Sequence, residues 1–150
     1  MEQIKAQDGA SIVLHSTGSG PGLLVVHGGG VTIDVYRRFA ARLADRFTVH
    51  LYNRRGRADA PARSLPYTVD QDIADLTAVL EYTGTRNVIG HSGGAFIALT
   101  AALRLPIDRL ALYVRWSQSA APSPPRGSTA HARRHAQVTS LGPWRSPAPA

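Results

Sequence analysis

A serine between closely spaced glycines is the strongest chemical signal in the chain: residues 90–94 read Gly-His-Ser-Gly-Gly, the pattern G-x-S-x-G. The pattern follows a short apolar segment, residues 87–89, and opens a mostly apolar segment, residues 93–105. A strand-to-helix turn of this kind holds a serine hydroxyl above the carboxyl edge of a sheet, where it can attack a carbonyl carbon. This context predicts Ser92 as a nucleophile, in preference to a chance Gly-Ser loop.

The residues around the serine also fit a tight turn. Gly90 and Gly94 stand where such a turn leaves no room for a larger side chain, and His91 sits directly beside the serine. The backbone N–H of Gly93, the residue after the serine, is expected to point at the oxyanion that develops during acyl transfer. The five residues therefore supply a nucleophile and one of the donors that stabilise its product.

A run of glycines supplies the second expected donor. His27, Gly28, Gly29 and Gly30 follow the apolar residues 23–26. Three glycines let a backbone approach a ligand closely, and an N–H from such a loop, here that of Gly29, completes an oxyanion hole. Taken alone, the run fits a phosphate-binding loop or a plain flexible loop equally well. The serine pattern farther along the chain favours the oxyanion role.

The segments around these motifs alternate between strand and helix patterns. Residues 4–6 and 11–15 flank Asp8-Gly9 and predict a β-hairpin. Beyond it, apolar runs of the kind found in buried strands alternate with helical periodicity: strands at 23–26, 47–52, 87–89 and 110–114, helices at 34–45, 68–83 and 93–105. Thr68 is expected to cap the second helix and Gly84 to end it. This order predicts an α/β fold with a mainly parallel sheet of about six strands and helices on both faces.

With these motifs the chain resembles the α/β-hydrolase family over residues 2–114. A third motif carries the resemblance: residues 52–58 read Tyr-Asn-Arg-Arg-Gly-Arg-Ala. This segment is similar to the family's D-x-R-G-x-G loop, with Asn53 and Ala58 in place of Asp and Gly. That loop is mainly structural in the family, so Arg55 receives no catalytic role.

The resemblance implies a fold and a chemistry. The family hydrolyses esters, amides, epoxides and similar bonds with a serine, an acid and a histidine. Carried onto this sequence, it implies Ser92 as the nucleophile, with Gly29 and Gly93 as the oxyanion donors. It implies no cofactor and no metal.

The other two members of the triad have no candidates in the expected places. The family places the acid after its seventh or sometimes its sixth strand and the histidine after its eighth, whereas residues 110–114 form the sixth predicted strand. No Asp or Glu follows Asp108, and His131 and His135 are the only histidines after Ser92. The four upstream histidines lie in predicted strands or in the motifs themselves. We therefore expect an impaired enzyme, because a serine without a base is a poor nucleophile.

Composition changes abruptly after residue 114. Residues 1–114 hold 12 basic and 10 acidic residues, whereas residues 115–150 hold 5 arginines and no acid, and Ala, Ser, Pro and Arg make up 24 of those 36 residues. Such a segment cannot bury enough apolar surface to offset its chain entropy. The sequence predicts an incomplete, truncated α/β-hydrolase domain at 1–114 and a disordered tail at 115–150. The Arg, Ser, Pro and Ala composition of residues 115–150 indicates a frameshifted or otherwise non-homologous end. The alternative is a genuine evolved tail. Translating the gene in its other two reading frames would distinguish the two.

Composition and charge also limit the partners. The chain has 150 residues, 43% of them hydrophobic, with no cysteine and no apolar run long enough to span a membrane. The N-terminus lacks the charged and apolar regions of a signal peptide. We therefore expect a cytoplasmic protein that does not bind membranes. The net charge of +7 resides mostly in the predicted tail, so nucleic-acid binding by the domain is not expected.

Two functions from different classes remain open. The first is esterase-like acyl hydrolysis of a small-molecule substrate, impaired in this chain. The alternative is a non-catalytic, degenerate hydrolase domain whose basic tail binds polyanions. In either case residues 110–114 predict an exposed edge strand without a blunting charge, through which the chain self-associates or aggregates.

Overall fold

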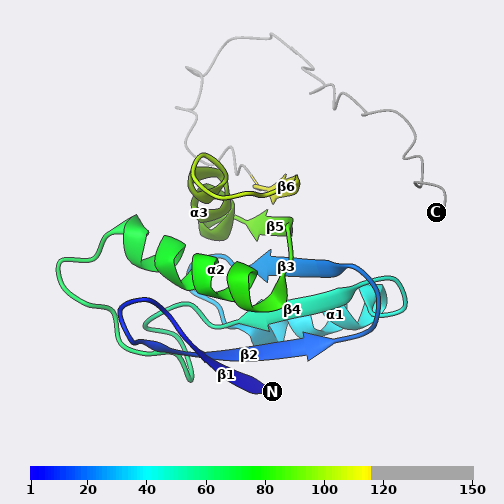
Figure 1. The fold of residues 1–150 in the computed structure, drawn as a ribbon, viewed down its shortest axis with the longest axis horizontal. Coiled ribbons are helices and arrows are strands. Elements are labelled where there is room, and N and C mark those ends of the chain that lie inside the picture. The colour runs from blue at the N-terminus through cyan, green and yellow to red at the C-terminus, as the bar shows by residue number, and fades with distance from the viewer. Residues whose placement is uncertain (116–150) are drawn as a thin grey trace, which may run out of the picture. The chain divides into compact units, whose positions relative to one another are not determined.

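Six strands form one sheet in the computed structural model, which describes residues 1–115 of the chain (Figure 1). The strands are β1 (Glu2–Lys5), β2 (Ser11–Thr17), β3 (Gly22–Val26), β4 (Thr48–Tyr52), β5 (Asn87–His91) and β6 (Arg109–Tyr113). Their order across the sheet is β1-β2-β4-β3-β5-β6. The helices are the 3-10 turn η1 (Ile33–Tyr36), α1 (Arg37–Leu43), α2 (Val69–Thr83) and α3 (Gly93–Ala102).

The predicted hairpin forms one antiparallel end of this sheet. β1 pairs with β2, and β2 pairs with β4, both antiparallel. The remaining pairs, β3 with β4, β3 with β5 and β5 with β6, are parallel. Because parallel strands end at the same edge of a sheet, the loops after β3, β4 and β5 meet there. Both predicted motifs and the arginine-containing loop follow these three strands.

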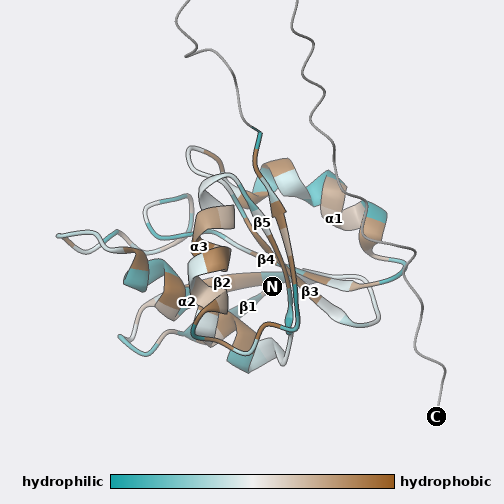
Figure 2. Cartoon of the chain, turned by 90° about the horizontal axis from the view of Figure 1, so that it is seen from above, coloured by the Kyte–Doolittle hydropathy of each residue, from teal (hydrophilic) through white to brown (hydrophobic). Residues whose placement is uncertain are grey.

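The helices cover the two faces of the sheet, as Figure 2 shows. On one face α2 and α3 pack in an apolar cluster with the strands; its members include Leu24, Val26, Leu76 and Ala98. On the other face η1 and α1 cover a smaller cluster around Val25. Residues of β3 alternate between the two clusters, since successive side chains of a strand point to opposite faces. The continuous apolar run of β3 is explained by burial on both sides.

The helix boundaries depart modestly from the sequence expectations. The helix predicted at 34–45 is divided into η1 and the shorter α1. α2 ends as predicted at Gly84, whose φ of 66° places it in the left-handed region, where glycine has no steric penalty. Thr68 takes the N-cap position of α2, but its side chain caps no backbone N–H. α3 ends at Ala102, before the predicted 105.

The predicted fold class, a mainly parallel α/β sheet with helices on both faces, is confirmed. The predictions for the tail, among them its disorder and the positions of His131 and His135, lie outside the described residues. Among residues 1–115, no helix is both long and apolar enough to cross a membrane.

Candidate active site

Ser92 occupies the turn between β5 and α3 with an unusual backbone conformation. Its φ is 52° and its ψ is −120°, a region that non-glycine residues rarely adopt. Two hydrogen bonds hold the turn: the Ser92 N–H donates to the Tyr113 carbonyl at 2.8 Å, and the Ser92 carbonyl accepts from the Ala95 N–H at 2.9 Å. The strand–turn–helix geometry that the sequence predicted for this serine is therefore present.

Close packing explains the glycines on either side of the serine. A Cβ added to Gly94 would lie 2.2 Å from the Val26 carbonyl oxygen. A Cβ added to Gly90 would lie 2.6 Å from the Ala95 Cα. Both distances are far below a van der Waals contact, so α3 begins directly against the end of β3. The expectation that these two positions need the smallest residue holds in the structure.

The glycine loop after β3 lies beside the serine. A Cβ built on Gly28 would be 3.3 Å from the Ser92 Cβ, and one built on Gly93 would be 3.5 Å from the Gly29 nitrogen. The Gly28 N–H is already engaged, because it donates to the Tyr36 hydroxyl at 3.1 Å. In residues 1–115 no hydrogen bond engages the N–H of Gly29 or Gly93. The two predicted oxyanion donors are thus neighbours, and both are available.

His27 is a buried structural residue of this loop. Its Nε2 accepts the Arg54 N–H at 3.0 Å, which leaves the ring proton on Nδ1, where it donates to the Gly28 carbonyl at 2.8 Å. Burial lowers the pKa of His27 and keeps the imidazole neutral. With both ring nitrogens engaged, His27 joins the glycine loop to the loop after β4 and cannot take a proton from Ser92.

His91 is held by aromatic neighbours. Its Nδ1 is hydrogen-bonded to the Tyr36 hydroxyl, and its ring stacks on Tyr113 with centroids 5.3 Å apart. The Tyr36 hydroxyl also accepts the Gly28 N–H. Tyr36 therefore connects the glycine loop with the turn that carries Ser92.

Two buried arginines follow β4 and anchor the loop to α2. Arg54 makes a two-pronged contact with Asp72, at 2.8 and 3.1 Å. Arg55 contacts Asp75 in the same way and also reaches Asp8. Burial alone would raise the pKa of Asp72, but hydrogen bonds from Arg54 and Tyr67 outweigh it and hold that pKa below its usual value. These contacts agree with the structural role that the sequence assigned to Arg55.

Arg54 also lies close to the oxyanion donors. A Cβ on Gly93 would be 3.8 Å from Arg54 Nη1, and the same nitrogen donates to the His27 carbonyl at 3.4 Å. Arg54 belongs to the motif at residues 52–58, but neither its contact with Asp72 nor the contact of Tyr36 with His91 was predicted, because these partners are distant in the sequence.

No described histidine is placed as a base for Ser92. His50 Nδ1 is hydrogen-bonded to Ser16 within the sheet, and His15 Nε2 lies 3.8 Å from Asp59. Among residues 1–115, no hydrogen bond joins an imidazole to the Ser92 hydroxyl. The structure therefore brings Ser92 close to Gly29 and Gly93, the residues predicted as nucleophile and oxyanion donors, and places no histidine of residues 1–115 in hydrogen-bond contact with the Ser92 hydroxyl.

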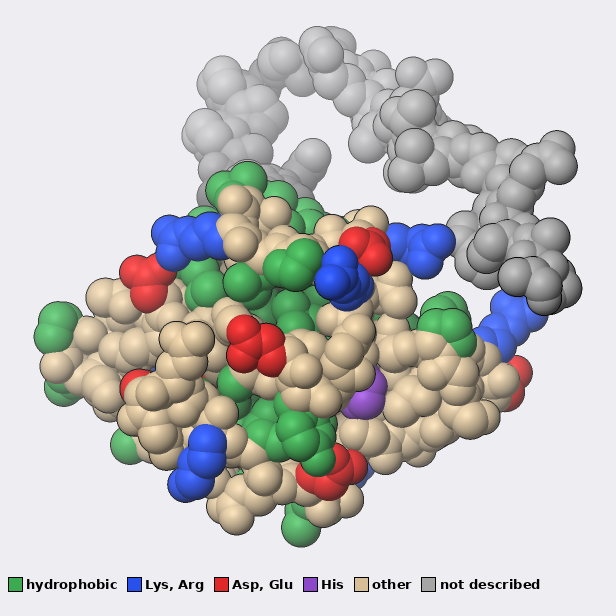
Figure 3. Space-filling view, in the orientation of Figure 1, with side chains coloured by type: hydrophobic (Ala, Val, Ile, Leu, Met, Phe, Trp, Pro, Cys, Tyr) green, Lys and Arg blue, Asp and Glu red, His purple; other side chains and the backbone are tan. Residues whose placement is uncertain are grey.

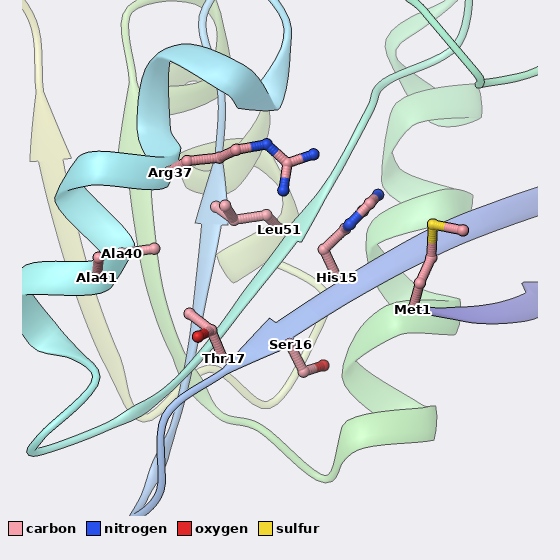
Figure 4. A pocket seen from close by; sticks show the side chains of 8 residues that line it. All are labelled: Met1, His15, Ser16, Thr17, Arg37, Ala40, Ala41 and Leu51. Carbon is pink, nitrogen blue, oxygen red and sulfur yellow. The ribbon is translucent and has the colours of Figure 1, made fainter.

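A cavity of about 270 Å³ lies away from this site (Figure 4). It is bordered by α1, β2 and β4, with His15, Arg37 and Leu51 in its lining. Arg37 is paired with Asp34 at 2.7 Å. Within the described part of the chain, no group of three or more His, Asp or Glu side chains is placed to hold a metal ion.

Comparison with known proteins agrees with this geometry. Residues 21–121 match the family described as alpha/beta hydrolase fold. The chain belongs to the α/β-hydrolase family. The match runs past residue 114, so the predicted domain boundary there stays a prediction.

Individual relatives are hydrolases and are much longer. An uncharacterized hydrolase, YraK of Bacillus subtilis, is 36% identical over 102 residues, covering 65% of this chain and 38% of that protein. A pimeloyl-[acyl-carrier protein] methyl ester esterase of Chromobacterium violaceum is 35% identical over 96 residues, covering 64% of this chain and 37% of that protein. The crystal structure of an alpha/beta hydrolase from Sphaerobacter thermophilus is 40% identical with a TM-score of 0.69, covering 74% of this chain and 44% of that one. The chain therefore spans less than half the length of these relatives.

Proposed function

We propose that this chain carries the nucleophile and the oxyanion hole of an esterase-like serine hydrolase. The observation that carries the proposal is the position of Ser92 at a positive φ, beside the N–H groups of Gly29 and Gly93, which make no hydrogen bond within residues 1–115. The esterase among the relatives supports carboxylic esters or related acyl compounds as the substrate class. A cytoplasmic location stays a prediction of the cysteine-free sequence.

The chemistry follows from the two loops. The Ser92 hydroxyl attacks the ester carbonyl carbon, and the carbonyl oxygen becomes an oxyanion that accepts hydrogen bonds from Gly29 and Gly93. The carbon–oxygen bond to the alcohol then breaks, the alcohol leaves with a proton, and water hydrolyses the acyl-serine to the acid. N–H groups fixed in advance stabilise the developing charge without reorganisation, which is the largest single contribution in such sites.

The rate of this chain is expected to be low. Both ring nitrogens of His27 and Nδ1 of His91 are engaged, and no imidazole among residues 1–115 is hydrogen-bonded to the Ser92 hydroxyl, so we expect the Ser92 proton to pass to water. Oxyanion stabilisation alone leaves only residual catalysis over the uncatalysed reaction, far below that of a complete triad. We expect hydrolysis of a simple aryl ester barely above background.

A fluorophosphonate probe tests the proposal. The full chain is incubated with the probe, and the labelled fraction is followed by intact mass, together with hydrolysis of a short-chain nitrophenyl ester. We expect slow labelling that maps to Ser92, and none in Ser92→Ala. Equal labelling or equal hydrolysis by Ser92→Ala would show that Ser92 is not the nucleophile.

The oxyanion donor has its own matched pair of variants. A Cβ on Gly29 meets nothing within 4 Å, so Gly29→Ala keeps both the space and the N–H. Gly29→Pro removes the N–H. Loss of one donor costs about 100-fold or more in rate, so the proline variant should lose the labelling that the alanine variant retains. Equal labelling of both variants contradicts the donor role.

A further inference from the structure

β6 presents an open edge among the described residues. It pairs with β5 and with no other strand in residues 1–115. Arg109 donates to the Arg86 carbonyl and Tyr113 accepts from Ser92, so the odd-numbered residues of β6 direct their backbone groups at β5. Since hydrogen-bonding direction alternates along a strand, Leu110 and Leu112 direct their N–H and C=O groups outward.

The side chains of β6 also leave an apolar surface. Leu112 is 43% exposed and Tyr113 61% exposed. On α3 and its C-cap, Phe96, Leu99 and Leu103 recur at spacings of three and four residues and are 62%, 48% and 81% exposed. Figure 3 shows hydrophobic side chains gathered over this helix. Because Leu110 packs with the α2–α3 cluster, Leu112 lies on the same face of the sheet as this stripe.

We propose that β6 pairs antiparallel with β6 of a second copy of this chain, about a two-fold axis through Ala111. In this register Leu110 of each copy faces Leu112 of the other, and the outward backbone groups of both leucines are satisfied. The sheets of the two copies become continuous, and their α3 stripes lie on the same face, on either side of the axis. The proposal is independent of the catalytic role of Ser92.

Charge and hydrogen bonding favour the register centred on Ala111 over the registers centred on Leu110 or Leu112. Centred on Ala111, the pairing sets Arg109 opposite Tyr113 of the second copy, where a guanidinium and an aromatic ring attract each other. Moving the centre to Leu112 would set Arg109 opposite Arg115, and like charges directly opposite are destabilising. Moving it to Leu110 would require the Asp108 N–H, which already donates to the Arg86 carbonyl at 2.9 Å.

Ala111, the residue on the two-fold axis, is small enough for the two β6 strands to approach closely. Ala111 forms a pair without mutual hydrogen bonds, in which the two Cα atoms come to about 4.5 Å. A small side chain is required there, and alanine meets that requirement. A lipid surface or a loose apolar partner would leave the outward N–H groups without acceptors, which a second strand supplies.

A single cysteine tests the register directly, because the natural chain has none. Ala111→Cys places two thiols across the axis at a separation that a disulfide spans. Ala41→Cys, an exposed position on α1, serves as the control for random collision. In the full chain under mild oxidation, we expect Ala111→Cys to form covalent dimers at least about ten-fold faster than the control. Equal rates would overturn the proposed pairing.

Sedimentation tests the backbone contact without any added thiol. We expect the full chain to show a concentration-dependent monomer–dimer equilibrium. Leu112→Pro removes an outward N–H without removing a bond to β5, and it should yield monomers, whereas Leu112→Val keeps the N–H and should retain the dimer. A chain that is monomeric at all concentrations, or a proline variant that still dimerises, overturns the proposal.

Discussion

The hydroxyl of Tyr36 is hydrogen-bonded to Nδ1 of His91 and at the same time accepts the N–H of Gly28. One phenol thus links η1, the glycine loop after β3 and the turn that carries Ser92. Because the Gly28 N–H is occupied, the next N–H, that of Gly29, is left to face a ligand. Which N–H of this loop could serve as the proposed oxyanion donor therefore depends on a tyrosine that the motif does not contain.

Tyr36→Phe removes this link and keeps the ring. We expect the free energy of unfolding to fall by about 1–2 kcal/mol, because a partly buried hydrogen-bond network loses its centre. The ¹⁵N shifts of the His91 ring should also change, since Nδ1 loses its hydrogen-bond partner. Urea unfolding and ¹⁵N NMR measure the two effects. Tyr82→Phe, which removes an exposed hydroxyl bonded to Glu2, should leave both unchanged; an equal effect of the two substitutions would contradict the linking role.

Two non-glycine residues among residues 1–115 adopt positive φ, and glycine should stabilise both positions. Ala58 has φ 39° and Ser92 has φ 52°. Strain at such positions costs on the order of 1–3 kcal/mol, which exceeds the extra flexibility that glycine adds to the unfolded chain. We expect Ala58→Gly to raise the free energy of unfolding by roughly 0.5–1 kcal/mol and Ser92→Gly by somewhat more.

Chemical denaturation measures both changes. Ala41→Gly in α1 is the control, and it should lower stability by about 0.5–1 kcal/mol, since glycine weakens a helix interior. Ser92→Gly should at the same time lose all labelling by the fluorophosphonate. A destabilised Ser92→Gly chain would mean that the turn stores no strain.

Two of the aspartates on α2 that pair with arginines, Asp70 and Asp72, should differ sharply in their contribution to stability. Asp72 is fully buried against Arg54, whereas the pair of Asp70 and Arg104 is exposed on both sides. Asp72→Asn leaves a buried guanidinium without its counter-charge, and we expect a loss of about 3–5 kcal/mol. Asp70→Asn should cost no more than about 0.5 kcal/mol. Thermal and urea unfolding measure the stability of the two variants. Similar losses in the free energy of unfolding would contradict the larger contribution expected of Asp72.

Stability should fall as the pH drops below the pKa of free histidine. Burial lowers the pKa of His27 and of His50 in the folded chain. Below about pH 6.5 the unfolded chain therefore binds more protons than the folded chain, and stability decreases with falling pH. For His27 alone the loss at pH 5.5 is at most about 1.4 kcal/mol.

Urea unfolding at pH 7.5 and 5.5 measures this dependence. His27→Gln removes one titrating group and should flatten the pH dependence by up to that amount, even if the substitution lowers stability at both pH values. An unchanged slope in His27→Gln would show that His27 is not held neutral by burial.

The sequence by itself was sufficient for the order of strands and helices and for placing Ser92 in a strand-to-helix turn. Apolar runs such as 23–26 and 110–114 predict strands of a parallel sheet, and both form strands, although only the first is buried on both faces. Gly84 and the glycines around Ser92 mark turns because their backbone conformations or contacts exclude other residues. These signals are local, and local steric rules act in the same way in any tertiary context.

The contacts that support the site were decided by the tertiary structure. Arg54 is hydrogen-bonded to Asp72 on α2, and Tyr36 is hydrogen-bonded to His91, more than fifty residues away in the chain. Both contacts form only because the sheet brings the loops at its carboxyl edge together. Which side chain faces which depends on strand register and on the rotation of each helix, and neither is encoded in a short motif. The sequence therefore predicted which serine occupies the turn, while the tertiary structure determined which residues lie around it and, within the described residues, placed no histidine in hydrogen-bond contact with its hydroxyl.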